Sequence, residues 1–248
     1  MRPPSQMKWR SDPNFSTFRI ERRELVIHRD IASQAAQILQ KLGMLTSAVE
    51  AGAGNRQSAF RMNLDDGHEV FARRSRRGGM IASILNDVYM GMTPRPLTEL
   101  AVTIEAMRRG IPVAEPMGAM VEWIAPVLYR GFFLTRAVPG MTLWEFLKTD
   151  DDPTVRSHVL GQARTAIDTM HEKGLFHADL NLHNLLVTQV RESFTVIIID
   201  LDKSRLFDAS VSPAMRRSNA ARLMRSARKL DPSGKILDAA ALSILSPQ

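Results

Sequence analysis

One short segment carries residues whose types and spacing suit the transfer of a phosphoryl group. The run His177-Ala-Asp-Leu-Asn-Leu-His-Asn184 places Asp179 five residues before Asn184, and Asp200 ends the hydrophobic run Ile197–Ile199. A carboxylate can accept the proton of an attacking hydroxyl, while an amide oxygen and a second carboxylate are hard ligands that suit Mg²⁺. The pattern predicts Asp179 as the base and Asn184 and Asp200 as metal ligands. The alternative is a solvated loop in which Asp and Asn only cap turns.

The elements around this segment predict that it lies in a mainly helical part of the chain. Residues 153–173 carry apolar side chains on one helical face and end before Gly174, which predicts a long helix. Short strands are expected at 185–188 and 195–199, and the remainder reads as helical and basic. The catalytic candidates would therefore lie on a loop between a long helix and a strand.

The preceding part of the chain alternates in the manner of strands. Residues 58–64 and 68–74 flank Asp65-Asp66-Gly67, a hairpin signal, and two further strands are expected at 117–123 and 128–138. A helix over 97–109 ends before Gly110. Together these elements predict a small antiparallel sheet with one main helix.

Pro139-Gly140 interrupts the strand pattern and is the expected boundary between two lobes. We divide the chain into an N-lobe over 48–138 and a C-lobe over 139–248. Residues 1–47 are expected to form an N-terminal extension of unknown role, irregular over 1–29 and helical near 30–42 until Gly43.

Composition narrows the functional classes. The 248 residues are 44% hydrophobic, contain no cysteine and carry a formal net charge of +7, supplied mostly by arginine. The missing cysteines exclude disulfides, thiol catalysis and cysteine-ligated metals. No apolar run approaches the roughly 20 residues of a spanning helix. The arginine excess favours an anionic partner, and an arginine-rich genome is the alternative explanation. A nucleic-acid partner is not expected, because basic and aromatic residues do not interleave.

Several ordered motifs resemble one family. The catalytic run resembles the protein-kinase superfamily pattern H-x-D-L-x-x-x-N, but the metal aspartate opens Asp200-Leu-Asp-Lys203, with Asp202 where protein kinases have glycine. The closer resemblance is to bacterial lipopolysaccharide core kinases, especially kinases of Kdo (3-deoxy-D-manno-octulosonic acid). It is carried by three further segments: Arg77-Gly-Gly79, Arg109-Gly-Ile-Pro-Val-Ala114 and Asn219-Ala-Ala-Arg-Leu-Met-Arg-Ser226.

The resemblance implies an α+β, two-lobed protein-kinase-like fold with a reduced, mainly helical C-lobe. It implies Mg²⁺-dependent transfer of the γ-phosphate of ATP to a Kdo hydroxyl on the lipid A–core precursor. The protein would then be cytoplasmic and peripheral on the inner membrane of a Gram-negative-type bacterium. Alternatives are a heptose kinase, a RIO-like or aminoglycoside-type phosphotransferase, and a pseudokinase or binding module.

The resemblance also implies which residues bind the nucleotide. Gly52 and Gly54 would form the loop over the ATP phosphates. Arg73 would take the place of the strand lysine that contacts the phosphates, with Arg74 as its rival. Its ion-pair partner would be Glu99, with Glu105 as the less favoured alternative. The usual hinge glutamate is replaced by Arg136. Supporting roles near the catalytic loop fall to four residues: His177, Asn181, His183 and Asp202.

Two arginine clusters remain. Arg76 and Arg77 follow the second strand, and Arg222 and Arg225 lie on a predicted basic amphipathic helix with no acidic residue over 213–230. These arginines are candidates for contact with an anionic substrate or an anionic membrane surface. The alternative is that the helix packs its apolar face on the lobe and shows its charges to water.

Overall fold

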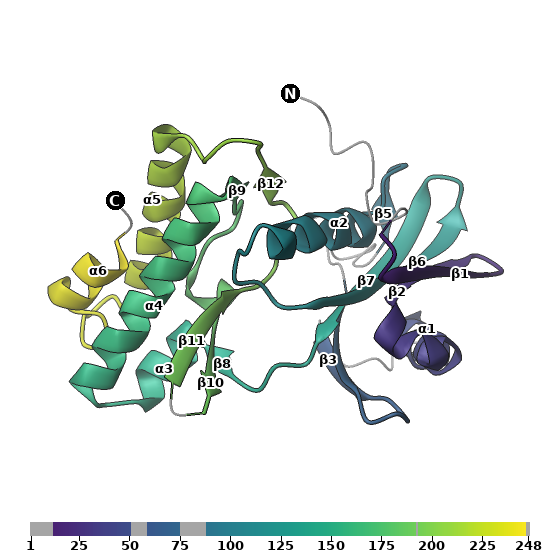
Figure 1. Ribbon diagram of the computed structural model, residues 1–248, viewed down its shortest axis with the longest axis horizontal. Helices are drawn as coiled ribbons and strands as arrows, with labels where there is room; N and C mark the ends of the chain where they lie inside the picture. Colours follow the sequence, from purple (N-terminus) through teal and green to yellow (C-terminus); the bar gives the residue numbers. More distant parts are fainter. Residues whose placement is uncertain (1–11, 51–58, 75–87, 192, 247–248) are drawn as a thin grey trace. The chain divides into compact units, whose positions relative to one another are not determined.

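The computed structural model describes residues 12–50, 59–74, 88–191 and 193–246 (Figure 1). Internal contacts divide the chain into two compact units. The N-terminal unit consists of Met1–Ile104 and Glu115–Ala137, and the C-terminal unit of Glu105–Ala114 and Val138–Gln248. The junction between Ala137 and Val138 lies next to the Pro139-Gly140 boundary expected from the sequence. Residues 105–114, assigned to the N-lobe from the sequence, group instead with the C-terminal unit.

The N-terminal unit is built on a seven-stranded antiparallel sheet of order β1-β2-β6-β7-β4-β3, with β5 paired to β7. Its strands are β1 (Phe15–Ile20), β2 (Arg23–His28), β3 (Ala59–Asn63), β4 (Glu69–Arg74), β5 (Tyr89–Met90), β6 (Pro116–Ala125) and β7 (Leu128–Arg136). The hairpin of β3 and β4 and the pair of β6 and β7 confirm the strand predictions for those segments.

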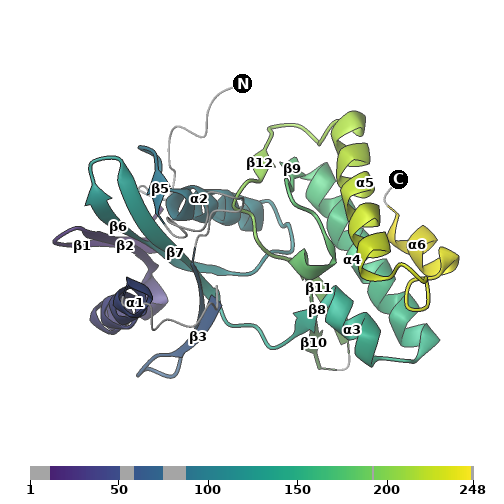
Figure 2. The same ribbon diagram turned by 180° about the vertical axis from the view of Figure 1, so that it is seen from behind.

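The two faces of this sheet are buried by different helices (Figures 1 and 2). A 3₁₀ turn, η2 (Arg29–Gln34), leads into α1 (Ala35–Glu50), whose Ile38 and Leu42 pack with Leu25 of β2. Helix α2 (Arg95–Arg108) places Leu100 against Val26 on the opposite face. Because neighbouring strand residues point to opposite faces, a continuous apolar run is what a doubly covered central strand requires.

The N-terminal residues depart from expectation. Positions 15–28, predicted to be irregular, form β1 and β2, and β2 lies inside the sheet between β1 and β6. The helix expected to stop at Gly43 continues to Glu50. Gly43 lies within this helix, where a Cβ would come within 2.8 Å of Nη1 at the flexible end of the Arg23 side chain. The N-terminal unit therefore has two principal helices rather than one.

The C-terminal unit is mainly helical. Its helices are α3 (Leu143–Thr149), α4 (Pro153–Glu172), α5 (Pro213–Leu230) and α6 (Ala239–Leu245), with a short 3₁₀ turn, η4 (Leu182–Asn184). Strands β8 (Met141–Thr142), β10 (Leu185–Val190) and β11 (Ser193–Ile198) form one small sheet, and β9 (Leu175–Phe176) pairs with β12 (Arg205–Leu206). The long helix, the loop after it and the following hairpin agree with the sequence analysis.

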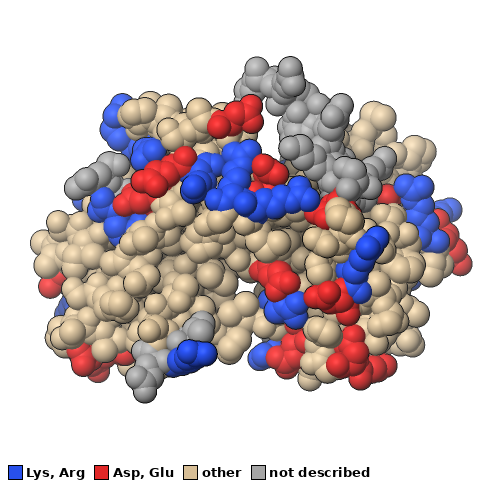
Figure 3. Space-filling view, in the orientation of Figure 1, with Lys and Arg blue, Asp and Glu red and all other residues tan. Residues whose placement is uncertain are grey.

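Within the described residues, no helix combines the length and apolar character needed to cross a membrane. On the face drawn in Figure 3, lysine and arginine side chains lie close to aspartate and glutamate side chains. The net charge of the chain is therefore not collected into one uniform basic surface on that face. The α+β architecture with a sheet-based and a helical unit confirms the predicted fold class.

Candidate functional site

The loop between β9 and η4 carries the predicted base. The backbone carbonyl of Asp179 accepts hydrogen bonds from Nδ2 of Asn181 at 2.9 Å and from Nδ2 of Asn184 at 2.8 Å. Oδ1 of Asn181 in turn accepts a hydrogen bond from the backbone N–H of His183 at 2.9 Å. The side chain of Asp179 remains 66% exposed. Two amides thus hold the main chain at Asp179 while leaving its carboxylate open to a substrate.

His177 anchors the same loop from inside the unit. It is fully buried, its Nδ1 accepts a hydrogen bond from the N–H of Asp179 at 3.1 Å, and its Nε2 lies 3.0 Å from the carbonyl of Ile199. These two contacts fit a neutral ring that carries its proton on Nε2. Burial lowers the pKa of His177, which favours that neutral form. The ring braces the loop, the role the sequence suggested for it.

The two predicted metal ligands lie on adjoining main-chain segments. The N–H of Ile199 donates to the carbonyl of Asn184 at 3.0 Å, which brings Asp200, the next residue, beside this amide. Because Nδ2 of Asn184 donates to the Asp179 carbonyl, its Oδ1 is the atom that can face a cation. Asp200 has φ of 65°, a left-handed conformation uncommon for a residue with a side chain.

The hydrogen bonds of Asn219 were not expected from the sequence. This buried residue of α5 donates from Nδ2 to the carbonyl of His177 at 2.6 Å, and its Oδ1 lies 3.0 Å from Nε2 of His171 on α4. The amide therefore ties α4, α5 and the catalytic loop together. Its place in the segment that resembles the kinase family was the only available signal, and that signal did not reveal its partner.

Replacing Asn219 by alanine is expected to lower the free energy of unfolding by about 3 kcal/mol. The change leaves the His171 ring N–H and the His177 carbonyl buried without their partner, and each unsatisfied buried group is costly. Urea unfolding of the variant measures the loss. Ser218→Ala, an exposed change at the preceding position, is the matched control and should alter stability by less than about 0.5 kcal/mol. Equal stability of the two variants would contradict this account.

Stability is expected to decline as the pH falls below about 6.5, the usual pKa of histidine. Burial lowers the pKa of both His177 and His171 in the folded protein. Below this pH the unfolded chain therefore binds more protons than the folded chain. The free energy of unfolding falls until the pH drops below the pKa values of the folded protein.

Urea unfolding between pH 8 and pH 5 tests this dependence. His171→Gln removes one of the two depressed groups and should flatten the profile, whereas His158→Gln, at an exposed position, should leave its slope unchanged. A wild-type profile that is flat over this interval would refute the expectation.

Asp179, the predicted base, has a basic neighbour. Nη1 of Arg222 on α5 lies 3.6 Å from Oδ1 of Asp179, and the Arg222 side chain is 42% exposed. Arg222 was singled out from the sequence as a contact for an anion, but its position beside the base was not foreseen. Arg225, its companion in that prediction, is exposed on the same helix.

In the N-terminal unit, the strand arginine and the helix glutamate meet. Nη2 of Arg73 on β4 lies 2.5 and 2.6 Å from the two carboxylate oxygens of Glu99 on α2, and Glu99 is only 1% exposed. Arg74 points to the other face of the sheet, where it donates to the carbonyl of Leu45 and lies over the ring of Phe132. The structure thus brings together Arg73 and Glu99 and separates Arg74 from them.

Glu99→Gln should destabilise the protein by about 3 kcal/mol, because the change removes the charge that neutralises a largely buried guanidinium. Thermal unfolding followed by circular dichroism measures the effect. Glu105, the rejected alternative, pairs instead with Arg108 and Arg109 and is 26% exposed. Glu105→Gln is therefore the control, with an expected loss of at most about 1 kcal/mol. A larger loss for Glu105→Gln than for Glu99→Gln would reverse the assignment.

The positive charge of Arg136, at the expected hinge position, is neutralised by an ion pair with Glu115. Its Nε and Nη2 lie 2.5 and 3.1 Å from the carboxylate oxygens of Glu115. The hydrogen bond from Arg136 lowers the pKa of Glu115. A carboxylate from the residue before β6 thus pairs with the arginine that stands at the expected hinge position.

Other sequence candidates are placed as follows. Gly52, Gly54, Arg76 and Arg77 lie outside the described residues. His183, one of the four residues given a supporting role, is exposed and therefore not part of the core. Leu201 is buried and Asp202 is half-buried beside it.

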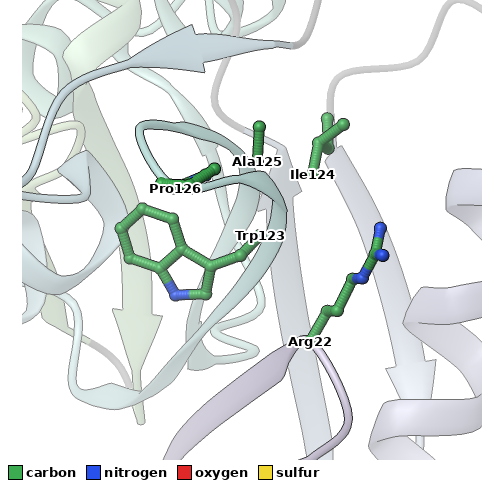
Figure 4. A pocket seen from close by; sticks show the side chains of 5 residues that line it. All are labelled: Arg22, Trp123, Ile124, Ala125 and Pro126. Atoms are coloured by element: carbon green, nitrogen blue, oxygen red, sulfur yellow. The ribbon is translucent and has the colours of Figure 1, made fainter.

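A pocket of about 340 Å³ lies at one end of the sheet in the N-terminal unit (Figure 4). Its lining consists of Arg22, Trp123, Ile124, Ala125 and Pro126. None of these residues is a predicted site residue, and their set contains no carboxylate, imidazole or hydroxyl. The pocket therefore adds nothing to the chemistry of the catalytic loop.

Comparison with known proteins supports the kinase interpretation. Residues 42–241 match the family described as "Lipopolysaccharide kinase (Kdo/WaaP) family". The chain is 32% identical over 180 residues to the 3-deoxy-D-manno-octulosonic acid kinase of Xylella fastidiosa (strain M23), covering 71% of this chain and 68% of the relative. It is also 32% identical over 187 residues to the enzyme of that name from Xanthomonas campestris pv. campestris (strain B100), with the same coverage.

A solved structure described as WaaP in complex with acyl carrier protein has the same fold, with a TM-score of 0.50 and 16% identity over 77% of this chain and 76% of that one. The likeness confirms the kinase-like fold, and the family match covers every described residue of the catalytic loop and both of its helical supports. The chain belongs to the lipopolysaccharide kinase (Kdo/WaaP) family, and it is a phosphotransferase that uses ATP and acts on a sugar hydroxyl.

Proposed function

We propose that this kinase phosphorylates a hydroxyl of a Kdo residue on the lipid A–core precursor of lipopolysaccharide. The observation that carries the proposal is the loop in which Asn184 hydrogen-bonds the main chain of Asp179. This contact keeps base and metal ligand at a constant separation. The relatives from two bacteria that bear the name Kdo kinase support the choice of acceptor.

Asp179 accepts the proton of the attacking hydroxyl. Its exposed carboxylate can reach a substrate, and its main chain is held by Asn181, Asn184 and His177. A loop restrained at this many points positions the base without having to reorganise when the acceptor arrives. The chain's contribution to catalysis is therefore mainly positioning.

Asn184 and Asp200 fit a magnesium ion. The Oδ1 of Asn184 and the carboxylate of Asp200 are hard oxygen donors on adjoining main-chain segments, and Mg²⁺ usually takes few protein ligands besides water and phosphate oxygens. When bound, the ion would neutralise charge on the phosphates of ATP. Arg73, which Glu99 holds in place, would bind phosphate oxygens from the N-terminal unit.

Peripheral contact with the cytoplasmic face of the inner membrane belongs to the same proposal. Buried Leu223 and Ala227 show that apolar side chains of α5 are used for packing within the unit, so contact of this helix with a bilayer would depend mainly on its charges. The exposed basic side chains on α5 are Arg217, Arg225, Arg228 and Lys229. Charges of this kind near an anionic surface attract it in a salt-dependent way.

The decisive experiment is phosphorylation in vitro of purified Kdo–lipid A with labelled ATP and Mg²⁺, followed by mapping of the product. We expect one phosphate on the Kdo residue. Label on a heptose-containing acceptor alone would make the protein a heptose kinase. ATP binding in a thermal-shift assay without transfer to any acceptor would make it a pseudokinase.

Flotation with vesicles tests the membrane contact separately. Vesicles of phosphatidylglycerol should retain the protein at low salt and release it at high salt, and vesicles of phosphatidylcholine should not bind it. Equal binding to both would remove this part of the proposal.

A further inference from the structure

Arg222 occupies a defined position next to the base. It lies one helical turn after Asn219, whose buried amide attaches α5 to the loop, and it precedes the fully buried Leu223. These two anchors fix the part of α5 from which Arg222 extends. The guanidinium is therefore held beside Asp179 by the packing of the unit.

The contact between Arg222 and Asp179 does not have the properties of a structural ion pair. Its 3.6 Å separation exceeds the range of a direct hydrogen bond, and the two side chains are 42% and 66% exposed. Pairs of this kind contribute little to stability because water and salt screen them. A role in holding the fold does not explain why an arginine is placed here.

The guanidinium has hydrogen-bonding capacity to offer. Arginine carries five N–H donors in a planar fork. In the part of the chain that the structure describes, Nε of Arg222 is buried without a hydrogen-bond acceptor, while the side chain as a whole is 42% exposed, so the donors that can reach a substrate are those on the two Nη atoms. A planar fork with donors to spare is suited to the two oxygens of a carboxylate.

We infer that Arg222 binds the carboxylate of the acceptor sugar whose hydroxyl Asp179 deprotonates. The inference rests on the proposed function, in which the acceptor is a sugar acid. The hydroxyl must come within hydrogen-bond reach of Asp179, and the carboxylate belongs to the same monosaccharide. The guanidinium beside the proposed base is then in reach of the acid group.

Kinetics with paired acceptors test the inference. The acceptors are a soluble Kdo-containing saccharide and its derivative in which the Kdo carboxylate is converted to a carboxamide. Arg222→Gln should raise KM for the acid acceptor about 30-fold, as expected for loss of a hydrogen bond between charged groups, with kcat changed less than about threefold. Wild type and variant should differ by less than about twofold on the amide. Arg222→Lys should recover part of the loss, because it keeps the charge but not the fork.

The control is Arg191→Gln, which removes the same charge from the exposed turn between β10 and β11 and should leave all constants unchanged. An equal loss for Arg222→Gln on both acceptors, or a loss confined to kcat, would overturn the inference.

A wild-type protein that phosphorylates neither acceptor would refute the proposed function instead. Calorimetric titration of the sugar acid in the presence of ADP then decides the role of Arg222. If Arg222→Gln weakens binding of the sugar acid, the proposed role of Arg222 is supported. If the sugar acid does not bind, or binds wild type and variant equally, that role is overturned.

Discussion

Asp179→Asn should reduce phosphoryl transfer by about a thousandfold or more while ATP still binds, because an amide cannot take the proton of the attacking hydroxyl. The substitution retains the shape of the side chain, and every hydrogen bond that holds the loop at this residue uses its main chain. The loop should therefore keep its path. Transfer is measured with labelled ATP under saturating acceptor, and ATP binding by thermal shift.

Asp208→Asn supplies the comparison for this variant. Asp208 is an exposed aspartate of the same unit, outside the catalytic loop, and its replacement removes the same charge. We expect full activity from it and an unfolding temperature close to that of wild type for both proteins. Activity of Asp179→Asn within tenfold of wild type would remove Asp179 from the role of base.

Asp200→Asn should lower kcat by about two to three orders of magnitude and shift the Mg²⁺ dependence to higher concentration. The change removes a negative oxygen donor from the proposed metal site, where phosphate charge would be neutralised. Asparagine is the suitable replacement because it tolerates the left-handed conformation at φ of 65° better than other residues with a side chain. Titration of activity with Mg²⁺, at constant ATP, measures both effects.

Asp202→Asn tests whether the second aspartate of this segment shares the metal. A loss much smaller than that of Asp200→Asn, without a shift in Mg²⁺ dependence, is expected if Asp200 is the ligand and Asp202 only supports the loop. A larger shift for Asp202→Asn would exchange the two roles. Unfolding temperatures of both variants separate these effects from loss of structure.

The catalytic loop could be predicted because its residues are consecutive. Asp179 and Asn184 lie five positions apart, so a local pattern brings them together whatever the rest of the chain does. The choice between Arg73 and Arg74 could not be made without knowledge of how the strands pair in the sheet. Adjacent strand residues face opposite sides, and only the pairing of β4 with β7 decides which of the two arginines faces α2.

Other features had no local signal. Asn219 reaches a carbonyl 42 positions earlier in the chain, and no periodicity in α5 indicates that contact. Strand β2 contains only a short apolar run, which is ambiguous without knowledge of its neighbours β1 and β6. Helix α1 continues through Gly43, a residue that often ends a helix, because the packing of α1 in the core outweighs the local preference.

The bonds that shape the catalytic loop have a consequence for how such enzymes diversify. Asn181, Asn184 and Asn219 all donate to main-chain carbonyls, which every amino acid provides. The exposed side chain at His183 is not among the groups that set the path of the loop. A substitution at His183 would therefore leave the hydrogen bonds that hold the main chain of Asp179 intact. Side chains around these bonds can vary in sequence while the path of the loop is retained.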